Sequence, residues 1–352
     1  MTLFTVDFKR EEHNMKQFLK ILCVILVFVL FFLLITRLLE PKYMTDLVEG
    51  SMIAEYYQET GKHDVIFIGD CEVYANFSPM VLYQEEGITA YIRGTSQQLL
   101  WQSYGILKET LKQEKPKVVV FNVNALRYGE PVSEAYNRLT LDKMKWSKEK
   151  VEMIQASMTE EENFVSYVFP ILRYHARFSQ LTSEDFTYFA KEKKNTHNGF
   201  LINQHVKPAG SLPTKKRLPS YDFPENTMAY LEKMANLCKE NGIEFVLIKA
   251  PSLYPYWYEE YNEQIVSFAQ KHDLDYYNLK EVAEEIGIDY TTDTYDGGLH
   301  LNLNGATKLS KYFAKVLKEE YGLEDYRENP EIRNAYKEKL KQYEQAIEET
   351  KI

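Results

Sequence analysis

Five short apolar runs, separated by segments with helical periodicity, constrain the fold of this chain more than any other feature. The runs occupy residues Val65–Ile68, Ile88–Ile92, Val118–Phe121, Ile243–Ile248 and Leu274–Leu279. Short apolar runs rich in β-branched and aromatic residues are typical of strands buried on both faces of a parallel sheet. The alternation of strand and helix therefore predicts an α/β fold, a flavodoxin-like three-layer sandwich with a five-stranded parallel sheet.

Candidate site residues gather where these predicted strands end. In such a sheet, ligands bind at the carboxyl ends of the strands, and this edge is within reach of Cys71, Gly94, Asn124, Lys249 and His300. Gly69 permits a sharp turn that places Cys71 at a helix start, where unpaired N–H groups favour a thiolate. His300 lies in a glycine-containing loop with an aspartate close by, so it is the candidate base for the thiol. A structural role is the alternative for His300, and His175 is the rival base.

The N-terminal region predicts one membrane span. An unbroken apolar run from Ile21 to Ile35, extended on both sides to residues 18–39, is long enough to cross a bilayer as a helix. Four Lys and Arg residues precede it, whereas two follow within twenty residues, and this bias predicts a cytoplasmic N-terminus with everything from about Glu40 outside. No small-x-small cleavage site follows the run, which favours an uncleaved anchor.

The pattern divides the chain into a cytoplasmic N-terminus (1–17), an anchor (18–39), a connector (40–62), an α/β domain (63–322) and a charged, helical, solvated tail (323–352). Residues 130–222 interrupt the strand–helix rhythm and are predicted to be a helical insertion that caps the active edge. Arg173 and His175 within it, and Lys249 at a strand end, are candidates for binding an anionic substrate. Ordinary packing of the cap and a solvated strand end are the alternatives.

Composition excludes some partners and cofactors. The net charge of −10 argues against nucleic acid, because a phosphate backbone favours a basic surface. The sequence contains neither a phosphate loop ending in Gly-Lys-Ser/Thr nor a Gly-x-Gly-x-x-Gly motif, so we expect no nucleotide cofactor, and we expect no metal. A disulfide between Cys71 and Cys238 is the alternative use of Cys71, but the two cysteines are predicted at opposite edges of the sheet.

Four sequence blocks together resemble the SGNH (GDSL) hydrolases: Gly69-Asp70-Cys71-Glu72, Gly94, Asn124 and the late Asp/His loop. The single anchor and the Gly-x-x-Glu pattern are similar to those of D-alanyl-lipoteichoic-acid transfer proteins and polysaccharide O-acetyltransferases. The resemblance implies an SGNH-like fold with Cys71 as nucleophile and His300 as base. It also implies an oxyanion hole formed by the backbone N–H groups of Cys71 and Gly94 and the side chain of Asn124.

Three positions depart from the family pattern. Cys71 stands where the family has serine, and Ala125 follows Asn124 where the family has aspartate. The family aspartate three residues before the histidine is replaced by Gly297, which leaves Asp296 as the first choice and Asp293 as the second for orienting His300.

These observations predict an extracytoplasmic enzyme that transfers acyl groups to a cell-envelope glycopolymer and receives them from a membrane-bound O-acyltransferase-type partner. An SGNH-type esterase is the first alternative, because it would use the same residues with water as acceptor. A non-catalytic protein that binds glycan or a partner is the second.

Overall fold

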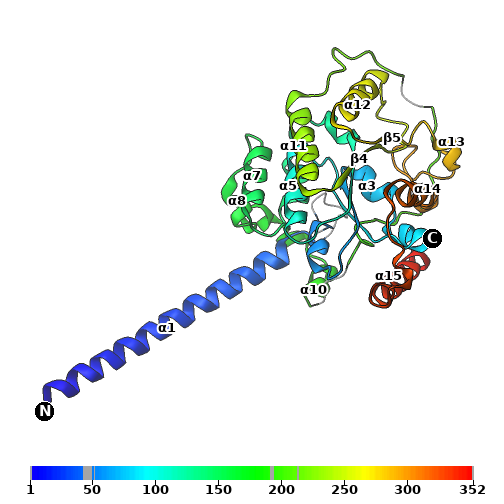
Figure 1. The fold of residues 1–352 in the computed structure, drawn as a ribbon. Coiled ribbons are helices and arrows are strands. Elements are labelled where there is room, and N and C mark those ends of the chain that lie inside the picture. Colours follow the sequence, from blue (N-terminus) through cyan, green and yellow to red (C-terminus); the bar gives the residue numbers. More distant parts are fainter. Residues whose placement is uncertain (1, 43–49, 51, 191–193, 212–213, 351–352) are drawn as a thin grey trace. The chain divides into compact units, whose positions relative to one another are not determined.

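The computed structural model describes residues 2–42, 50, 52–190, 194–211 and 214–350, which form two compact units (Figure 1). The helical unit comprises residues 1–42 and 163–193, and the α/β unit comprises residues 43–162 and 194–352, as far as each is described. The predicted insertion at 130–222 is thereby divided, because its middle part belongs to the helical unit and its two ends to the α/β unit.

The α/β unit contains a sheet of five parallel strands in the spatial order β2-β1-β3-β4-β5. The strands are β1 (Val65–Gly69), β2 (Ala90–Gly94), β3 (Val118–Asn122), β4 (Glu244–Lys249) and β5 (Tyr276–Asn278). This all-parallel order is the flavodoxin-like arrangement, so the predicted fold class is confirmed. The predicted strands differ from the observed ones only at their ends.

The strand order places a crevice beside β1. The chain leaves β1 for β2 on one side and returns to β3 on the other, so the connections diverge between β1 and β3. In open α/β sheets, ligands bind at such a point, outside the carboxyl ends of the strands. Cys71 is the first residue of α3 (Cys71–Asn76) and is separated from β1 only by the N-cap residue Asp70. Asn124 follows β3 within a short 3-10 helix, η2 (Val123–Arg127). The topology therefore brings these two residues to the same crevice.

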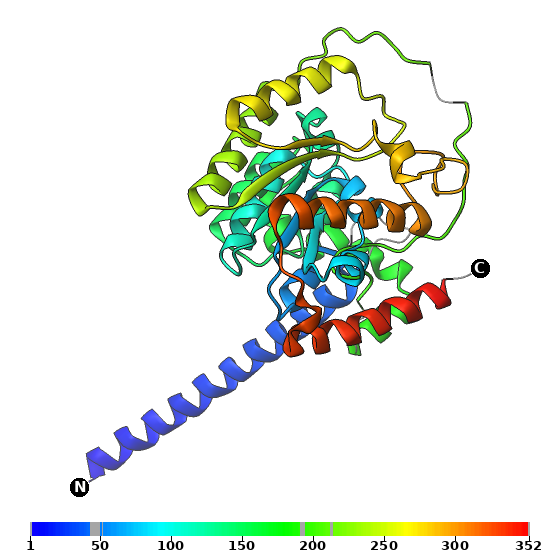
Figure 2. The same cartoon turned by 45° about the vertical axis from the view of Figure 1, so that its right-hand side comes forward.

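Helices cover both faces of the sheet (Figures 1 and 2). On one face lie α3 (Cys71–Asn76), α4 (Pro79–Glu86), α14 (Leu303–Tyr321) and α15 (Pro330–Glu349). Next to one another on the other face lie α5 (Leu100–Leu111), α7 (Lys148–Ser157) and α11 (Glu225–Asn241). The remaining helices of this unit are α2 (Met52–Glu55), η1 (Tyr56–Gln58), α6 (Glu134–Leu141), α12 (Glu259–His272), α13 (Ala283–Ile286) and η4 (Tyr326–Glu328).

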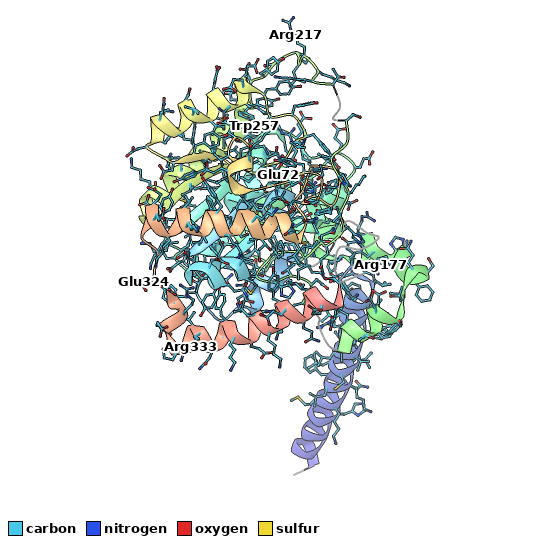
Figure 3. All side chains as sticks on the ribbon, turned by 90° about the vertical axis from the view of Figure 1, so that its right-hand side faces the viewer. Glu72, Arg177, Arg217, Trp257, Glu324 and Arg333 are labelled. Atoms are coloured by element: carbon cyan, nitrogen blue, oxygen red, sulfur yellow. The ribbon has the colours of Figure 1, made fainter. Side chains whose placement is uncertain are left out.

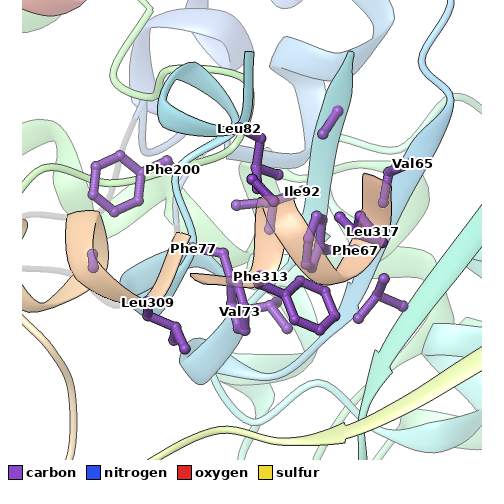
Figure 4. Close-up of a cluster of buried hydrophobic side chains, with 14 of the residues drawn as sticks. Val65, Phe67, Val73, Phe77, Leu82, Ile92, Phe200, Leu309, Phe313 and Leu317 are labelled. Atoms are coloured by element: carbon purple, nitrogen blue, oxygen red, sulfur yellow. The ribbon is translucent and has the colours of Figure 1, made fainter. Parts of the chain in front are cut away.

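The core beneath α3 is aromatic (Figure 4). The ring of Phe67 on β1 lies 5.0 Å from that of Phe77, just after α3, and the Phe77 ring lies 5.6 Å from that of Phe313 on α14. All three side chains are fully buried. This packing fixes α3 against the sheet and against α14, so the helix that begins at Cys71 has a rigid support.

The C-terminal tail is helical as predicted, but it is docked rather than solvated. Tyr336 and Tyr343 of α15 are buried, the Tyr336 ring stacks on that of Tyr83 at 3.9 Å, and Ser78 donates a hydrogen bond to the Tyr343 hydroxyl at 3.3 Å. The prediction overlooked this because the two tyrosines, seven residues apart, form a narrow stripe among many charges.

The helical unit is built around α1 (Thr2–Leu39), which carries a stretch, His13–Leu39, that is long and apolar enough to cross a membrane. The other helices of this unit are α8 (Phe164–Val168), α9 (Ile171–Tyr174), η3 (His175–Gln180) and α10 (Ser183–Ala190). Of these, α9, η3 and α10 contact α1, and the ring of Phe169, just after α8, meets that of Phe32 on α1.

Candidate functional site

The turn after β1 holds Cys71 at the first position of α3. Asp70 is the N-cap, and its side chain accepts a hydrogen bond from the backbone N–H of Glu72 at 3.1 Å. A Cβ added to Gly94 would lie 2.2 Å from Cγ2 of Val73. A glycine is therefore required at the end of β2 so that α3 can begin beside it, which gives Gly94 a packing role in addition to its implied oxyanion role.

His300 lies within hydrogen-bond distance of Asp296. The Nδ1 atom of His300 lies 2.6 Å from Oδ2 of Asp296, and the backbone N–H of His300 donates to Oδ1 at 2.8 Å. Burial alone would raise the pKa of Asp296, but the hydrogen bonds from His300 lower it below its usual value, so the carboxylate is charged. With Nδ1 donating to this carboxylate, Nε2 of the neutral ring carries the lone pair that a base needs.

Asp293 has a different task, which decides between the two aspartates. It is buried, it accepts hydrogen bonds from Lys308 at 2.7 Å and Asn304 at 2.5 Å, and it fixes the start of α14. Gly297, at the family position of the aspartate, has a φ of +85°, a conformation that a residue with a Cβ rarely adopts. The backbone of this loop therefore favours glycine at 297 and gives the orienting role to Asp296.

Beneath Cys71 lies a buried polar network that the sequence analysis did not predict. Glu72, seen inside the α/β unit in Figure 3, is fully buried. Lys249 Nζ is 3.2 Å from both Glu72 carboxylate oxygens and donates to Ser252 at 2.7 Å. Ser252 donates to Glu72 Oε1 at 2.5 Å, and Asn122 donates to Oε2 at 2.8 Å. Burial would raise the pKa of Glu72, but the Lys249 ammonium holds it below its usual value.

The role suggested for Lys249 is therefore corrected. Its side chain has no exposed surface, and its charge is satisfied within the protein, so it offers no cation to an anionic substrate. The prediction failed because Lys249 ends a strand, where solvent access is common, and no sequence signal identified Glu72 as its partner. The Gly-x-x-Glu pattern marked Glu72, but only the fold shows that this carboxylate faces β4.

A second group of hydrogen bonds surrounds Asp70. Its Oδ1 accepts from Asn122 at 3.0 Å, and its Oδ2 accepts from Asn124 at 2.7 Å and from the Tyr128 hydroxyl at 3.1 Å. Asn124 is thus held at the crevice by Asp70. Its buried Oδ1 atom has no hydrogen-bond partner within the described part of the chain. The Nδ2 amide group of Asn124 already donates one hydrogen bond to Asp70, so the implied oxyanion role would use its other N–H.

The electrostatics at Cys71 differ from the sequence-based expectation. Desolvation, followed by the charges of Asp70 and Glu72, raises the pKa of the Cys71 thiol well above its usual value. The helix start was expected to favour a thiolate, but α3 is short and two carboxylates flank the sulfur in sequence. Because the thiol is neutral near pH 7, any nucleophilic role requires a base that removes its proton during the reaction.

The loop that carries His300 is tied to α3 by a hydrogen bond to the side-chain Oδ1 of Asn76. Asn76, the last residue of α3, accepts a hydrogen bond from the N–H of Leu301, the neighbour of His300, at 2.8 Å. Nε2 of His300 is buried and has no hydrogen-bond partner among the described residues, so it makes no hydrogen bond to Cys71 in this state. Catalytic hydrogen bonds are often absent before substrate binds and form only in the complex.

The other candidates lie elsewhere. Arg173 and His175 belong to the helical unit, with α1, and not to the unit that carries Cys71 and His300. His175 is exposed and its Nδ1 lies 3.0 Å from the carbonyl oxygen of Leu172. Cys71 and Cys238 are both free, which agrees with the argument against a disulfide. Over the described ranges, no three His, Cys, Asp or Glu side chains form a group that could hold a metal ion.

Comparisons with known proteins give likenesses in structure only. The sequence matches no protein-family model and no curated protein. Among solved structures, a candidate acylhydrolase from Bacteroides fragilis shares 12% identity at a TM-score of 0.37, over 79% of this chain and 100% of that one. A candidate lipolytic protein of the G-D-S-L family from Desulfitobacterium hafniense shares 13% identity at a TM-score of 0.37, over 72% of this chain and 98% of that one. A GDSL-like lipase from Bacteroides thetaiotaomicron shares 12% identity at a TM-score of 0.32, over 73% of this chain and 88% of that one. At these TM-scores the likenesses carry no argument about the reaction.

Proposed function

We propose that this protein transfers acyl groups through a thioester on Cys71, with His300 as the base and Asp296 as the residue that orients it. The observation that supports this most strongly is the Asp296–His300 pair. It holds the ring in the tautomer that leaves Nε2 free to accept a proton, at the edge of the sheet where α3 begins with Cys71. The resemblance of the four sequence blocks to SGNH hydrolases supports the same assignment.

The proposed chemistry runs in two steps. The Cys71 sulfur attacks the carbonyl carbon of an ester while its proton passes to Nε2 of His300. The tetrahedral intermediate then collapses, the carbon–oxygen bond to the leaving alcohol breaks, and His300 returns the proton to that oxygen. In the second step an acceptor hydroxyl attacks the thioester by the reverse route, which restores the Cys71 thiol.

We further propose that this reaction takes place outside the cytoplasm and that the acceptor is an envelope glycopolymer. The apolar stretch of α1 and the excess of Lys and Arg before it support this orientation. A membrane-bound O-acyltransferase-type partner would supply the acyl group. The esterase alternative differs only in that water takes the place of the acceptor hydroxyl.

Release of p-nitrophenol from p-nitrophenyl acetate by the full-length protein tests the acyl chemistry. Cys71→Ala is expected to abolish turnover, and His300→Ala to lower it by about 10²–10⁴-fold, which is the usual contribution of a general base. Cys23→Ala and His175→Ala are the matched controls and should retain the parent rate. An unchanged rate in Cys71→Ala would contradict the proposal. Formation of acetylglycerol when glycerol is added would favour transfer, and release of acetate alone would favour the esterase.

A further inference from the structure

The helical unit carries an unusual concentration of exposed apolar side chains. Outside α1, ten large apolar side chains are exposed among the described residues, and six of these lie between residues 165 and 186. The six, which we call the apolar patch, are Val165, Val168, Phe169, Leu172, Phe178 and Phe186. Phe178 is 78% exposed. Exposed large apolar side chains gathered in one short segment are typical of a site of contact with a protein or a membrane.

The apolar patch adjoins the part of α1 that is expected to be inside the bilayer. The ring of Phe169 meets that of Phe32 edge to face at 6.2 Å. Phe32 lies within the unbroken apolar run and about 10 Å along the axis before the end of α1, at 1.5 Å per residue. If α1 spans the bilayer, Phe169 lies beside a residue about 10 Å inside the end of the span.

The last carbonyl groups of α1 accept hydrogen bonds from Arg177 of the same segment and from Lys42, just after α1. Arg177 donates to the carbonyl oxygen of Leu39 at 2.7 Å and pairs with Asp185 at 3.0 Å (Figure 3). Lys42 donates to the carbonyl oxygens of Arg37 and Leu38 at 2.7 and 2.6 Å. The last carbonyl groups of a helix need such partners wherever water is scarce, and cations at this end also complement the helix dipole. Arg177 and Lys42 thus provide hydrogen-bond partners for the last carbonyl groups of α1, at the level where the helix is expected to leave the lipid.

We propose that residues 163–190 form a membrane-surface element whose apolar patch inserts into the leaflet at which α1 ends, with lipid acyl chains as its occupant. This inference rests on α1 being a membrane span and is independent of the chemistry at Cys71. Lipid is the occupant because the patch meets α1 at the Phe169–Phe32 contact, and the apolar side chains of α1 are themselves exposed along the span. An interfacial helix of this kind buries its apolar face about 5–10 Å into the boundary between headgroups and acyl chains.

Quenching by brominated lipids tests the depth of the patch. The full-length protein is reconstituted into phosphatidylcholine vesicles, with or without brominated phosphatidylcholine, and carries Phe178→Trp, Phe28→Trp or Val132→Trp. Phe28 lies in the middle of the apolar run, and Val132 is an exposed apolar side chain of the α/β unit (59%). The emission of the parent protein is subtracted to remove the native tryptophans.

We expect the tryptophan introduced at 178 to lose emission when bromine is near the glycerol end of the acyl chain, and to lose less when it is near the terminal methyl. The tryptophan at 28 should show the opposite order, and the one at 132 should lose little with either lipid. Quenching at 28 without quenching at 178 would overturn the proposal while leaving the span intact, and would assign the patch to a protein partner. Absence of quenching at 28 would overturn both the span and the proposal, whereas equal quenching at 178 and 132 would overturn the proposal alone.

Discussion

Replacement of Lys249 by methionine should destabilise the α/β unit strongly, because it leaves a buried carboxylate without its counter-charge. Both partners of the Glu72–Lys249 pair are fully buried, and the ammonium lies 3.2 Å from each carboxylate oxygen. Removal of one partner of such a pair typically costs about 3–5 kcal/mol. Ser252 and Asn122 would still donate to Glu72, which favours the lower part of that range.

The matched double variant separates the lost charge from the lost packing. In Glu72→Gln/Lys249→Met no buried charge remains at this site, and neutral replacement of both partners of a buried pair is often tolerated. We therefore expect the double variant to be more stable than Lys249→Met by about 2 kcal/mol or more, a coupling of the size seen for contacting residues.

Urea unfolding of the full-length protein in detergent micelles, followed by near-ultraviolet circular dichroism, measures these free energies. Lys271→Met is the control: Lys271 pairs with Glu232 at the surface at 3.4 Å, and such pairs contribute about 0–1 kcal/mol. If Lys249→Met costs no more than Lys271→Met, the buried Glu72–Lys249 pair does not stabilise the α/β unit.

Three further outcomes are expected. Asp296→Asn should lower kcat for p-nitrophenyl acetate by about 10³–10⁴-fold, because the amide no longer fixes the tautomer of His300; a loss under tenfold would contradict this. Alkylation of Cys71 by iodoacetamide should be slower than that of glutathione at pH 8 and rise only at higher pH, because the raised pKa keeps the thiol protonated; a rate plateau below pH 8, read by peptide mass spectrometry, would show the opposite. Tyr336→Ala should cost about 3–5 kcal/mol in the same urea assay, because it removes the ring stacked on Tyr83, and a cost under about 1 kcal/mol would indicate that α15 is not docked.

The sequence was enough to predict the sheet, because each buried parallel strand leaves a local apolar run in the sequence. Apolar runs such as Val118–Phe121 are buried on both faces, so the pattern alone predicts both the strand and its layer. The position of Cys71 at a helix start followed from Gly69 in the same way. Asp296 was chosen from its spacing to His300, and in the structure it is the aspartate that lies within hydrogen-bond distance of the ring.

The failures concern pairings across long stretches of chain. Lys249 and Glu72 are separated by 177 residues, and neither their contact nor their burial has a local signal. The pKa of Cys71 also depends on the fold, because its largest cause is desolvation by burial, which the local sequence does not show. The middle of the predicted cap was likewise assigned by its position in the sequence, whereas its contacts are with α1.

The measurement that tests the central proposal most directly is the detection of an acyl group on Cys71. The full-length protein is incubated briefly with p-nitrophenyl acetate, quenched in acid and digested for peptide mass spectrometry. We expect an acetyl group on the peptide that contains Cys71, removable by neutral hydroxylamine as a thioester should be, and greatly reduced in His300→Ala. p-Nitrophenol release that persists in Cys71→Ala, with no acetylated Cys71 peptide in the parent protein, would contradict it.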